Sequence, residues 1–242
     1  MKAMLTNVMP AVINLNLTSV SKLLYCWVAQ QIKAESLVWL DEKRKQISNG
    51  ANVRVFFTAF SAVPRYTGKN DLELTQDDLK AASTAVAGWV PAHWSVDQAA
   101  RTLLLLSLPQ DNATEYLHTL EQVFTTADVG ELIALYQALP LLPYPEKLRH
   151  RAAEGVRSNM TAVFNAVALN NPYPAQYFDN LAWNQMVLKA FFVGSSVNLI
   201  QGLNQRVNPE LAKMLIDYAN ERQAAGRSLA PEIWQLVDLV NS

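Results

Sequence analysis

Cysteine is nearly absent from this chain of 242 residues, since Cys26 is the only one. A single cysteine cannot form an intrachain disulfide, and a zinc site built mainly from cysteine thiolates is excluded for the same reason. Cys26 lies in an apolar segment, residues 23–28 (LLYCWV), so we expect it to be a small buried core residue. A reactive thiol is the alternative.

Charge and long apolar runs are also scarce. Only 17% of the residues are charged and the formal net charge is −1, so there is no large electrostatic excess to attract nucleic acid or an anionic membrane. No segment approaches the roughly 18 apolar residues of a transmembrane helix. Residues 1–16 lack the apolar core and the cleavage site of a secretory signal. We therefore expect an N-terminal arm at 1–16 and a cytoplasmic protein, with a cryptic signal as the alternative.

The motifs of common catalytic and metal sites are missing as well. The three histidines, His93, His118 and His150, are scattered without the spacing of metal ligands, and no His-Glu-x-x-His motif occurs. The sequence has only eight glycines, no glycine-rich phosphate loop and no Gly-x-Ser-x-Gly motif. We expect neither a cofactor nor a metal ion.

Helical periodicity is what the chain has instead. Half of the residues are hydrophobic, which supports a large core. Residues 132–192 contain three apolar helical patterns, separated by proline corners at 140–145 (PLLPYP) and 170–174 (NNPYP). Pro145 and Pro174 are predicted to open the helices that follow. Between the corners, apolar residues recur at steps of three and four, which predicts one long helix with an apolar face: Leu148, Ala152, Val156, Met160, Val163, Phe164 and Val167.

Similar patterns predict helices along the rest of the chain. Their expected ranges are 18–47, 54–64 (with a strand as the alternative for 53–57), 75–90, 95–108, 113–125, 128–139, 208–226 and 231–240. Two Leu-Pro pairs, 108–109 and 139–140, end apolar helices 31 residues apart, a spacing that suggests stacked helix pairs. We predict a single all-α domain over 17–242, arranged as an irregular α-α superhelix with HEAT-like pairs; an irregular helical bundle is the alternative.

Several phrases together resemble the EboA-domain family, from about Leu17 to Arg227. They are FFTAFSAVPR (56–65), WSVDQAAR (94–101), EGVRSNM (154–160), NPYP (171–174), AWNQMVLKA (182–190) and NPELA (208–212). The resemblance implies a protein encoded in a bacterial gene cluster, found in cyanobacteria and other bacteria, that serves a secondary metabolite and moves a pigment precursor towards the cell envelope. It implies no established activity and no catalytic residues. In the final helix the family pattern has a histidine where this chain has Asn220, which argues against a metal or acid/base role at that position.

The same resemblance implies partners. Genes of the cluster encode proteins similar to a membrane prenyltransferase of the UbiA type, a metal-dependent hydrolase and a sugar-phosphate cyclase. We therefore expect other proteins of the cluster as partners, among them the membrane prenyltransferase, and a small-molecule intermediate as ligand. Nucleic acid is not expected as a partner.

A polar stripe along the predicted long helix is the first candidate site. Its members are Arg151, Glu154, Arg157, Ser158, Thr161 and Asn165. Glutamate and arginine three residues apart can pair on one helix face, and such a row in a concave surface could bind a polar ligand or a peptide. The alternative is a solvated face whose ion pairs contribute roughly 0–1 kcal/mol each.

Two further groups of polar residues interrupt apolar helices. Asn184, Gln185 and Lys189 could contact a ligand, although buried amides more often fasten a helix to a neighbouring corner. Asp217 and Glu221 are four residues apart, a spacing that suits an acid and base pair or a cation, but also ordinary exposed helix charges.

Together these observations favour a non-catalytic helical scaffold or binding protein that serves the biosynthesis or envelope export of a secondary metabolite. The alternative is an enzyme that uses Glu154, Asp217 or Glu221 on a small terpenoid or sugar-derived intermediate. A helical-repeat nucleic-acid binder is a third hypothesis, which the near-neutral charge disfavours.

Overall fold

The computed structural model describes residues 17–241, which form thirteen α-helices, three short 3-10 helices and no β-strand. The α-helices are α1 Leu17–Ala29, α2 Ala34–Ser48, α3 Val53–Thr67, α4 Gln76–Ala85, α5 Val96–Leu106, α6 Ala113–Thr126, α7 Val129–Ala138, α8 Arg149–Arg157, α9 Thr161–Ala168, α10 Tyr173–Tyr177, α11 Asn180–Val193, α12 Pro209–Ala224 and α13 Glu232–Asn241. The 3-10 helices are η1 Leu139–Leu141, η2 Pro145–Leu148 and η3 Val197–Leu199. The all-α prediction is confirmed, while the predicted arm at 1–16 lies outside the described residues.

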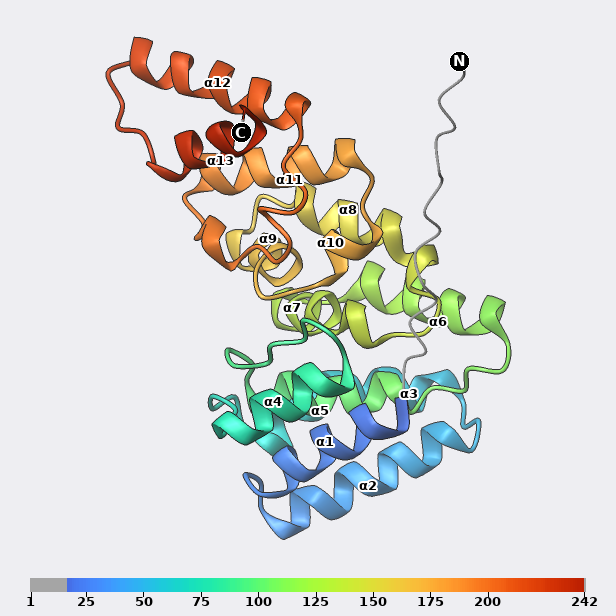
Figure 1. Ribbon diagram of the computed structural model, residues 1–242. Helices are drawn as coiled ribbons and strands as arrows, with labels where there is room; N and C mark the ends of the chain where they lie inside the picture. Colours follow the sequence, from blue (N-terminus) through green and yellow to red (C-terminus); the bar gives the residue numbers. More distant parts are fainter. Residues whose placement is uncertain (1–16, 242) are drawn as a thin grey trace, which may run out of the picture.

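The helices are layered along one direction (Figure 1), from α1 and α2 at one end to α12 and α13 at the other. Helix α5 packs against α1, α2, α3 and α7, and α7 in turn packs against α9. Beyond α9 the contacts pass to α11, α12 and α13. The more specific expectation of a HEAT-like superhelix stays a prediction, because these helices vary in length from 5 to 16 residues.

Capping residues account for several helix starts that the sequence predicts. Thr75 accepts a hydrogen bond from the backbone N–H of Asp78, and the Asp78 carboxylate accepts one from the backbone N–H of Thr75, which is a reciprocal cap. Asn208 accepts from the backbone N–H of Leu211 at the start of α12. These caps satisfy donors that would otherwise be orphaned in the first turn.

The prediction of one helix from Thr18 to Ile47 is wrong, because α1 ends at Ala29 and α2 begins at Ala34. The turn between them is held by hydrogen bonds to a residue that is distant in the sequence. The Gln31 side chain donates to the carbonyl of Glu73 at 3.0 Å and accepts from the backbone N–H of Glu73 at 2.9 Å. Neither proline nor glycine marks the break, so the local pattern could not indicate it.

The prediction of one long helix across residues 148–167 is also wrong. It is divided into α8 and α9 at residues 158–160, where the Lys189 ammonium group donates to the carbonyls of Val156 at 2.6 Å and Ser158 at 2.7 Å. Because Lys189 comes from α11, it supplies the orphaned carbonyls at the end of α8 with a partner that the local sequence does not show. The polar stripe is thereby divided between two helices.

Two smaller corrections concern α3 and α4. The helix predicted to end at Pro64 continues to Thr67, and the strand alternative for 53–57 is excluded because those residues lie in α3. Pro64 has no N–H to donate to Phe60, whose carbonyl instead accepts from the buried Arg101 Nε at 3.2 Å. Helix α4 ends at Ala85, before the expected 89–91, because Val86 adopts an extended backbone with φ −139° and ψ 117°. Gly88 then turns the chain with a φ of +80°.

Cys26 is exposed, which contradicts the expectation of a buried core residue. On α1 the buried residues are Val20, Leu24, Trp27 and Val28. Cys26 is two positions after Leu24, about 200° around a helix, and so lies on the opposite face.

Candidate functional site

The predicted stripe residues Arg151 and Glu154 form part of an ion-pair cluster between α8 and α6. The Arg151 guanidinium donates to Glu154 Oε2 at 2.6 Å, to both carboxylate oxygens of Glu121, and to Thr125 Oγ1 at 3.2 Å. Its carbon Cζ lies 5.6 Å from the ring centroid of Phe124. The hydrogen bond with Glu121 raises the pKa of Arg151 above its usual value. These contacts join two helices and leave Arg151 committed to partners within the protein.

Asn184 and Lys189 make structural contacts. Asn184 is 3% exposed, and its amide forms a reciprocal pair with the Asn208 amide at 3.0 and 2.9 Å, which joins α11 to the start of α12. Lys189, besides its bonds to the end of α8, lies 5.4 Å from the ring centroid of Phe164. Burial lowers the pKa of Lys189. The contacts of Asn184 and Lys189 therefore fit the structural alternative, in which polar side chains of this helix fasten it to neighbouring segments.

Arg157, Asp217 and Glu221 are exposed. Glu221 lines an open groove of about 590 Å³ between α9, α11 and α12, with Lys189 and Tyr218. Glu154 belongs to the cluster described above and does not line this groove. The groove is also lined by Ser158, Thr161 and Gln185, so it brings together members of all three predicted groups. Arg151, Glu154, Arg157, Asn184 and Asp217 do not line it.

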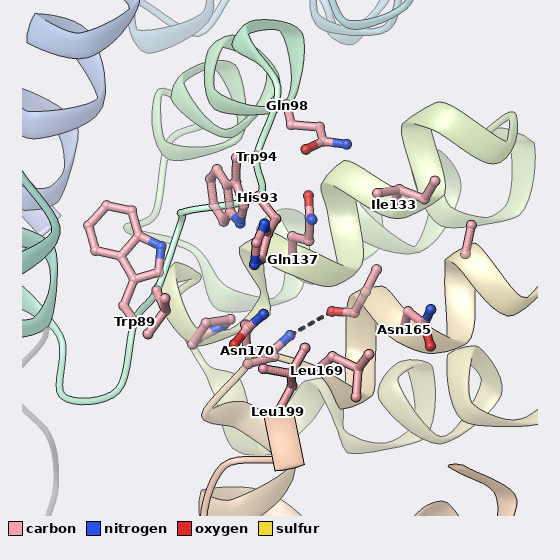
Figure 2. A pocket seen from close by; sticks show the side chains of 15 residues that line it. Trp89, His93, Trp94, Gln98, Ile133, Gln137, Asn165, Leu169, Asn170 and Leu199 are labelled. Atoms are coloured by element: carbon pink, nitrogen blue, oxygen red, sulfur yellow. Dashed lines mark hydrogen bonds between the residues drawn. The ribbon is translucent and has the colours of Figure 1, made fainter. Parts of the chain in front are cut away.

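Asn165, another of the predicted residues, lies in a different site. It lines a partly enclosed cavity of about 290 Å³ and accepts a hydrogen bond from Ser195 Oγ at 2.7 Å. The cavity is bounded by the loop before α5 and by α5, α7, α9, the 170–171 corner and η3. Its lining residues are Trp89, Val90, His93, Trp94, Gln98, Ile133, Gln137, Pro140, Ala162, Asn165, Ala166, Leu169, Asn170, Asn171 and Leu199 (Figure 2).

Hydrogen bonds to backbone carbonyls hold the loop that carries the tryptophans. The carbonyl of Gly88 accepts from Gln201 Nε2 at 2.5 Å, which ties this loop to the segment after η3. At its other end, the carbonyl of Trp94 accepts from the backbone N–H of Leu72 at 2.8 Å. The ring of Trp89 lies between Trp27, at 5.6 Å between centroids, and Trp94, at 6.0 Å. Packing and hydrogen bonds together thus fix the aromatic wall of the cavity.

Asn171 fixes the opposite wall. Its amide nitrogen donates to the carbonyls of Tyr136 at 3.0 Å and Ala166 at 2.9 Å, and its amide oxygen accepts from the backbone N–H of Tyr173 at 3.0 Å. One buried side chain thereby connects α7, α9 and α10. The cavity is preformed, as is usual for small-molecule sites.

Two residues of the lining each have one polar atom that is closed off from the cavity and has no hydrogen-bond partner among the residues that the structure describes. These atoms are the indole nitrogen Nε1 of Trp89, a side chain that is 1% exposed, and the amide oxygen Oε1 of Gln137. In Figure 2 the Trp89 nitrogen is on the ring edge that faces the other labelled residues. A buried polar group without a partner costs about 1–3 kcal/mol, so these two atoms call for an explanation.

Apart from the exposed His93, the lining contains no titratable side chain. None of its fifteen residues, all in the described part of the chain, is Asp, Glu, Lys or Arg, and His93 is exposed. Sequence reasoning missed Trp89 and Gln137, because no motif connects residues 48 positions apart. The cluster of two tryptophans, a histidine and a proline at 89–94 was the available signal, since functional residues are often found on loops that a rigid scaffold positions.

Fold and cavity together define an all-helical protein with a partly enclosed pocket between helices that are distant in sequence. The family model described as "Metabolite traffic protein EboA" matches residues 20–238. The chain therefore belongs to the EboA family, and a role connected with metabolite traffic follows from that description at this general level. A search of curated proteins and a search of solved structures found no match. Within residues 17–241, no helix combines the length and the apolarity that crossing a bilayer requires.

Proposed function

We propose that this protein is a non-catalytic binding protein that holds a small intermediate of a secondary-metabolite pathway in the cavity beside Trp89 and Gln137. The observation that carries the proposal is a preformed, partly enclosed cavity of about 290 Å³, lined mainly by aromatic and apolar side chains together with several amide side chains. The aromatic and apolar side chains would supply contact area for a small ligand, and the amide side chains of the lining would orient it. The family description is consistent with this role.

The enzyme alternative receives less support from the placement of its carboxylates. Glu154 is paired with Arg151 at 2.6 Å, and Asp217 and Glu221 are exposed on α12. None of the three lines the cavity. A general acid and a general base must both reach the same substrate, and the placement of these carboxylates does not favour such catalysis.

Partners in the same pathway are the second part of the proposal. A cytoplasmic binding protein would receive its ligand from one protein of the gene cluster and deliver it to another, for example the membrane prenyltransferase. Leu181 and Phe192, on one face of α11, are 67% and 73% exposed, which is compatible with a protein contact. Affinity pull-down with the other proteins of the cluster present tests this part, and repeated failure to recover any of them would contradict it.

Recovery of a bound metabolite tests the binding function. The full chain is purified from a bacterial host that carries the intact gene cluster, and native mass spectrometry then detects any bound compound. Ala162→Phe places a ring at the exposed edge of the cavity, and Ala34→Phe makes the same change at the exposed start of α2, outside the cavity. We expect the wild type and Ala34→Phe to carry the compound and Ala162→Phe to lose it. An empty wild type, or an Ala162→Phe protein loaded to the same extent, would contradict the proposal.

A further inference from the structure

We infer that the groove between α9, α11 and α12 is a docking site for an amphipathic helix of a partner protein, with lysine or arginine beside the apolar face of that helix. This inference rests on the partner part of the proposed function, to which it adds the surface and the chemistry of the partner, and it is independent of the cavity. Three observations carry it: an exposed apolar stripe on α11, the groove beside the stripe, and the charge of the groove wall.

The outer face of α11 is apolar, although a helix face turned to solvent is usually polar. Leu181, Leu188 and Phe192 follow one another at steps of seven and four residues, which places them within about 40° around the helix axis. Phe192 and Leu181 are 73% and 67% exposed, the two highest values among the exposed large hydrophobic residues that the structure describes. Exposed apolar side chains that gather on one face, rather than lie scattered, mark an interaction surface.

The stripe borders the groove of about 590 Å³, much of whose lining is aromatic or apolar. These side chains come from all three helices and are Phe164, Leu188, Phe192, Val193 and Tyr218. The residues of α11 that line the groove extend from Gln185 to Val193, which is about 12 Å along the helix axis. The groove can therefore accommodate about two turns of a partner helix, which would insert apolar side chains at the i, i+3, i+4 and i+7 positions.

The charge of the groove wall selects a basic partner. Glu221 lines the groove, and Asp217 lies one turn before it on α12; both are exposed. Within residues 17–241 neither carboxylate has an ion-pair partner. Lys189 is the one cationic residue of the lining, and its ammonium group is bound to the carbonyls of Val156 and Ser158. Lysine or arginine of the partner would pair with the carboxylates, whereas an acidic partner would be repelled.

The same charges disfavour two other occupants, an anionic membrane and a second copy of this chain. Asp217 and Glu221 would repel anionic lipid headgroups. In a symmetric dimer formed through the stripe, α11 of each copy would face the other copy. Lys189 is the only charged residue of α11 and is already bound to backbone carbonyls, so the carboxylates would still have no cation to pair with.

Three peptides of 14 residues, the length of α11, test the inference. The first consists of leucine, alanine and lysine, with the leucines on one face of a helix. The second has glutamate in place of each lysine, and the third has the composition of the first in an order that scatters the leucines. Fluorescence anisotropy of the labelled peptides measures their binding to the full chain. We expect the first peptide to bind, and the second and third to bind at least tenfold more weakly.

Three variants of the protein locate the binding. Phe192→Ser should weaken binding of the first peptide about tenfold, because it removes a large apolar contact. Glu221→Lys should weaken the first peptide about threefold and strengthen the second by a similar factor, because it reverses the charge of the groove wall. Val38→Ser is the matched control, since Val38 is 58% exposed but lies on α2, in a different layer of the molecule (Figure 1). It should leave all three affinities unchanged.

The inference is overturned if the acidic or the scrambled peptide binds as tightly as the first, if Val38→Ser weakens binding as much as Phe192→Ser, or if Glu221→Lys leaves both affinities unchanged. Light scattering, and flotation with vesicles of phosphatidylcholine and phosphatidylglycerol, test the other occupants. A dimer, or a vesicle-bound protein, that Phe192→Ser abolishes would also overturn the inference. A protein of the gene cluster that is still recovered by pull-down with Phe192→Ser would show that the partner function stands and that only this surface is wrong.

Discussion

Replacement of Gln137 by leucine should stabilise the ligand-free protein. The Gln137 amide oxygen is buried without a partner, and relief of such a group contributes about 1–3 kcal/mol. An imperfect match of shape subtracts up to about 1.5 kcal/mol. We therefore expect the free energy of unfolding to rise by about 1 kcal/mol, which for a chain of this size raises Tm by about 2–4 °C.

Urea unfolding of protein stripped of ligand measures this change, with an unchanged m value as the sign that the denatured state is unaffected. Asn171→Leu is the matched control, because its buried amide makes three hydrogen bonds. It should lose about 3 kcal/mol or more, since both its own bonds and those of its backbone partners disappear. Loss of 1 kcal/mol or more in Gln137→Leu would refute the reasoning, because it would mean that the amide oxygen has a stabilising partner.

Four further changes test the account elsewhere. Arg101→Met should destabilise the fold by about 3–5 kcal/mol in urea unfolding, because it leaves the Asp97 carboxylate, 7% exposed, without its ion-pair partner at 2.5 Å. Gly155→Ala should cost about 1–3 kcal/mol by the same assay, because a Cβ there would lie 2.6 Å from a side chain of α9. Burial lowers the pKa of Lys189, so the folded protein releases the Lys189 proton at a lower pH than the unfolded chain does. The free energy of unfolding of the wild type, relative to that of Lys189→Met, should therefore rise as the pH approaches the ordinary lysine pKa. A fall over that pH range would contradict the argument. Glu154→Gln should leave metabolite recovery unchanged and cause no precursor to accumulate in metabolite profiles of the host, whereas accumulation with the protein still folded would favour the enzyme alternative.

Periodicity and capping residues predict the helices of this protein well. The apolar spacing before Pro140 and the caps at Thr75 and Asn208 are local signals. Helices α4 and α12 begin, and α7 ends, near the expected residues. A helix face depends on residues three and four apart, which a single sequence contains in full.

The helix breaks and the cavity depend on contacts that the local sequence does not contain. Gln31 ends α1 through a partner 42 residues away, and Lys189 ends α8 through carbonyls 31 and 33 residues away. Similarly, Trp89 and Gln137 come from separate elements, and neither is distinguished until the fold leaves its polar atom without a partner. The candidate sites were predicted mainly from charged residues. In the structure, however, Arg151 and Lys189 contact other parts of the protein.

The Trp89 indole N–H signal gives the most direct test of the claim that this cavity holds a metabolite. Its position is compared between protein purified from a host with the gene cluster and the same protein after the ligand has been stripped by unfolding and refolding. The account predicts that the Trp89 signal differs between the two samples while the Trp183 signal does not. Identical spectra, with a compound nevertheless bound, would place the ligand elsewhere and contradict the account.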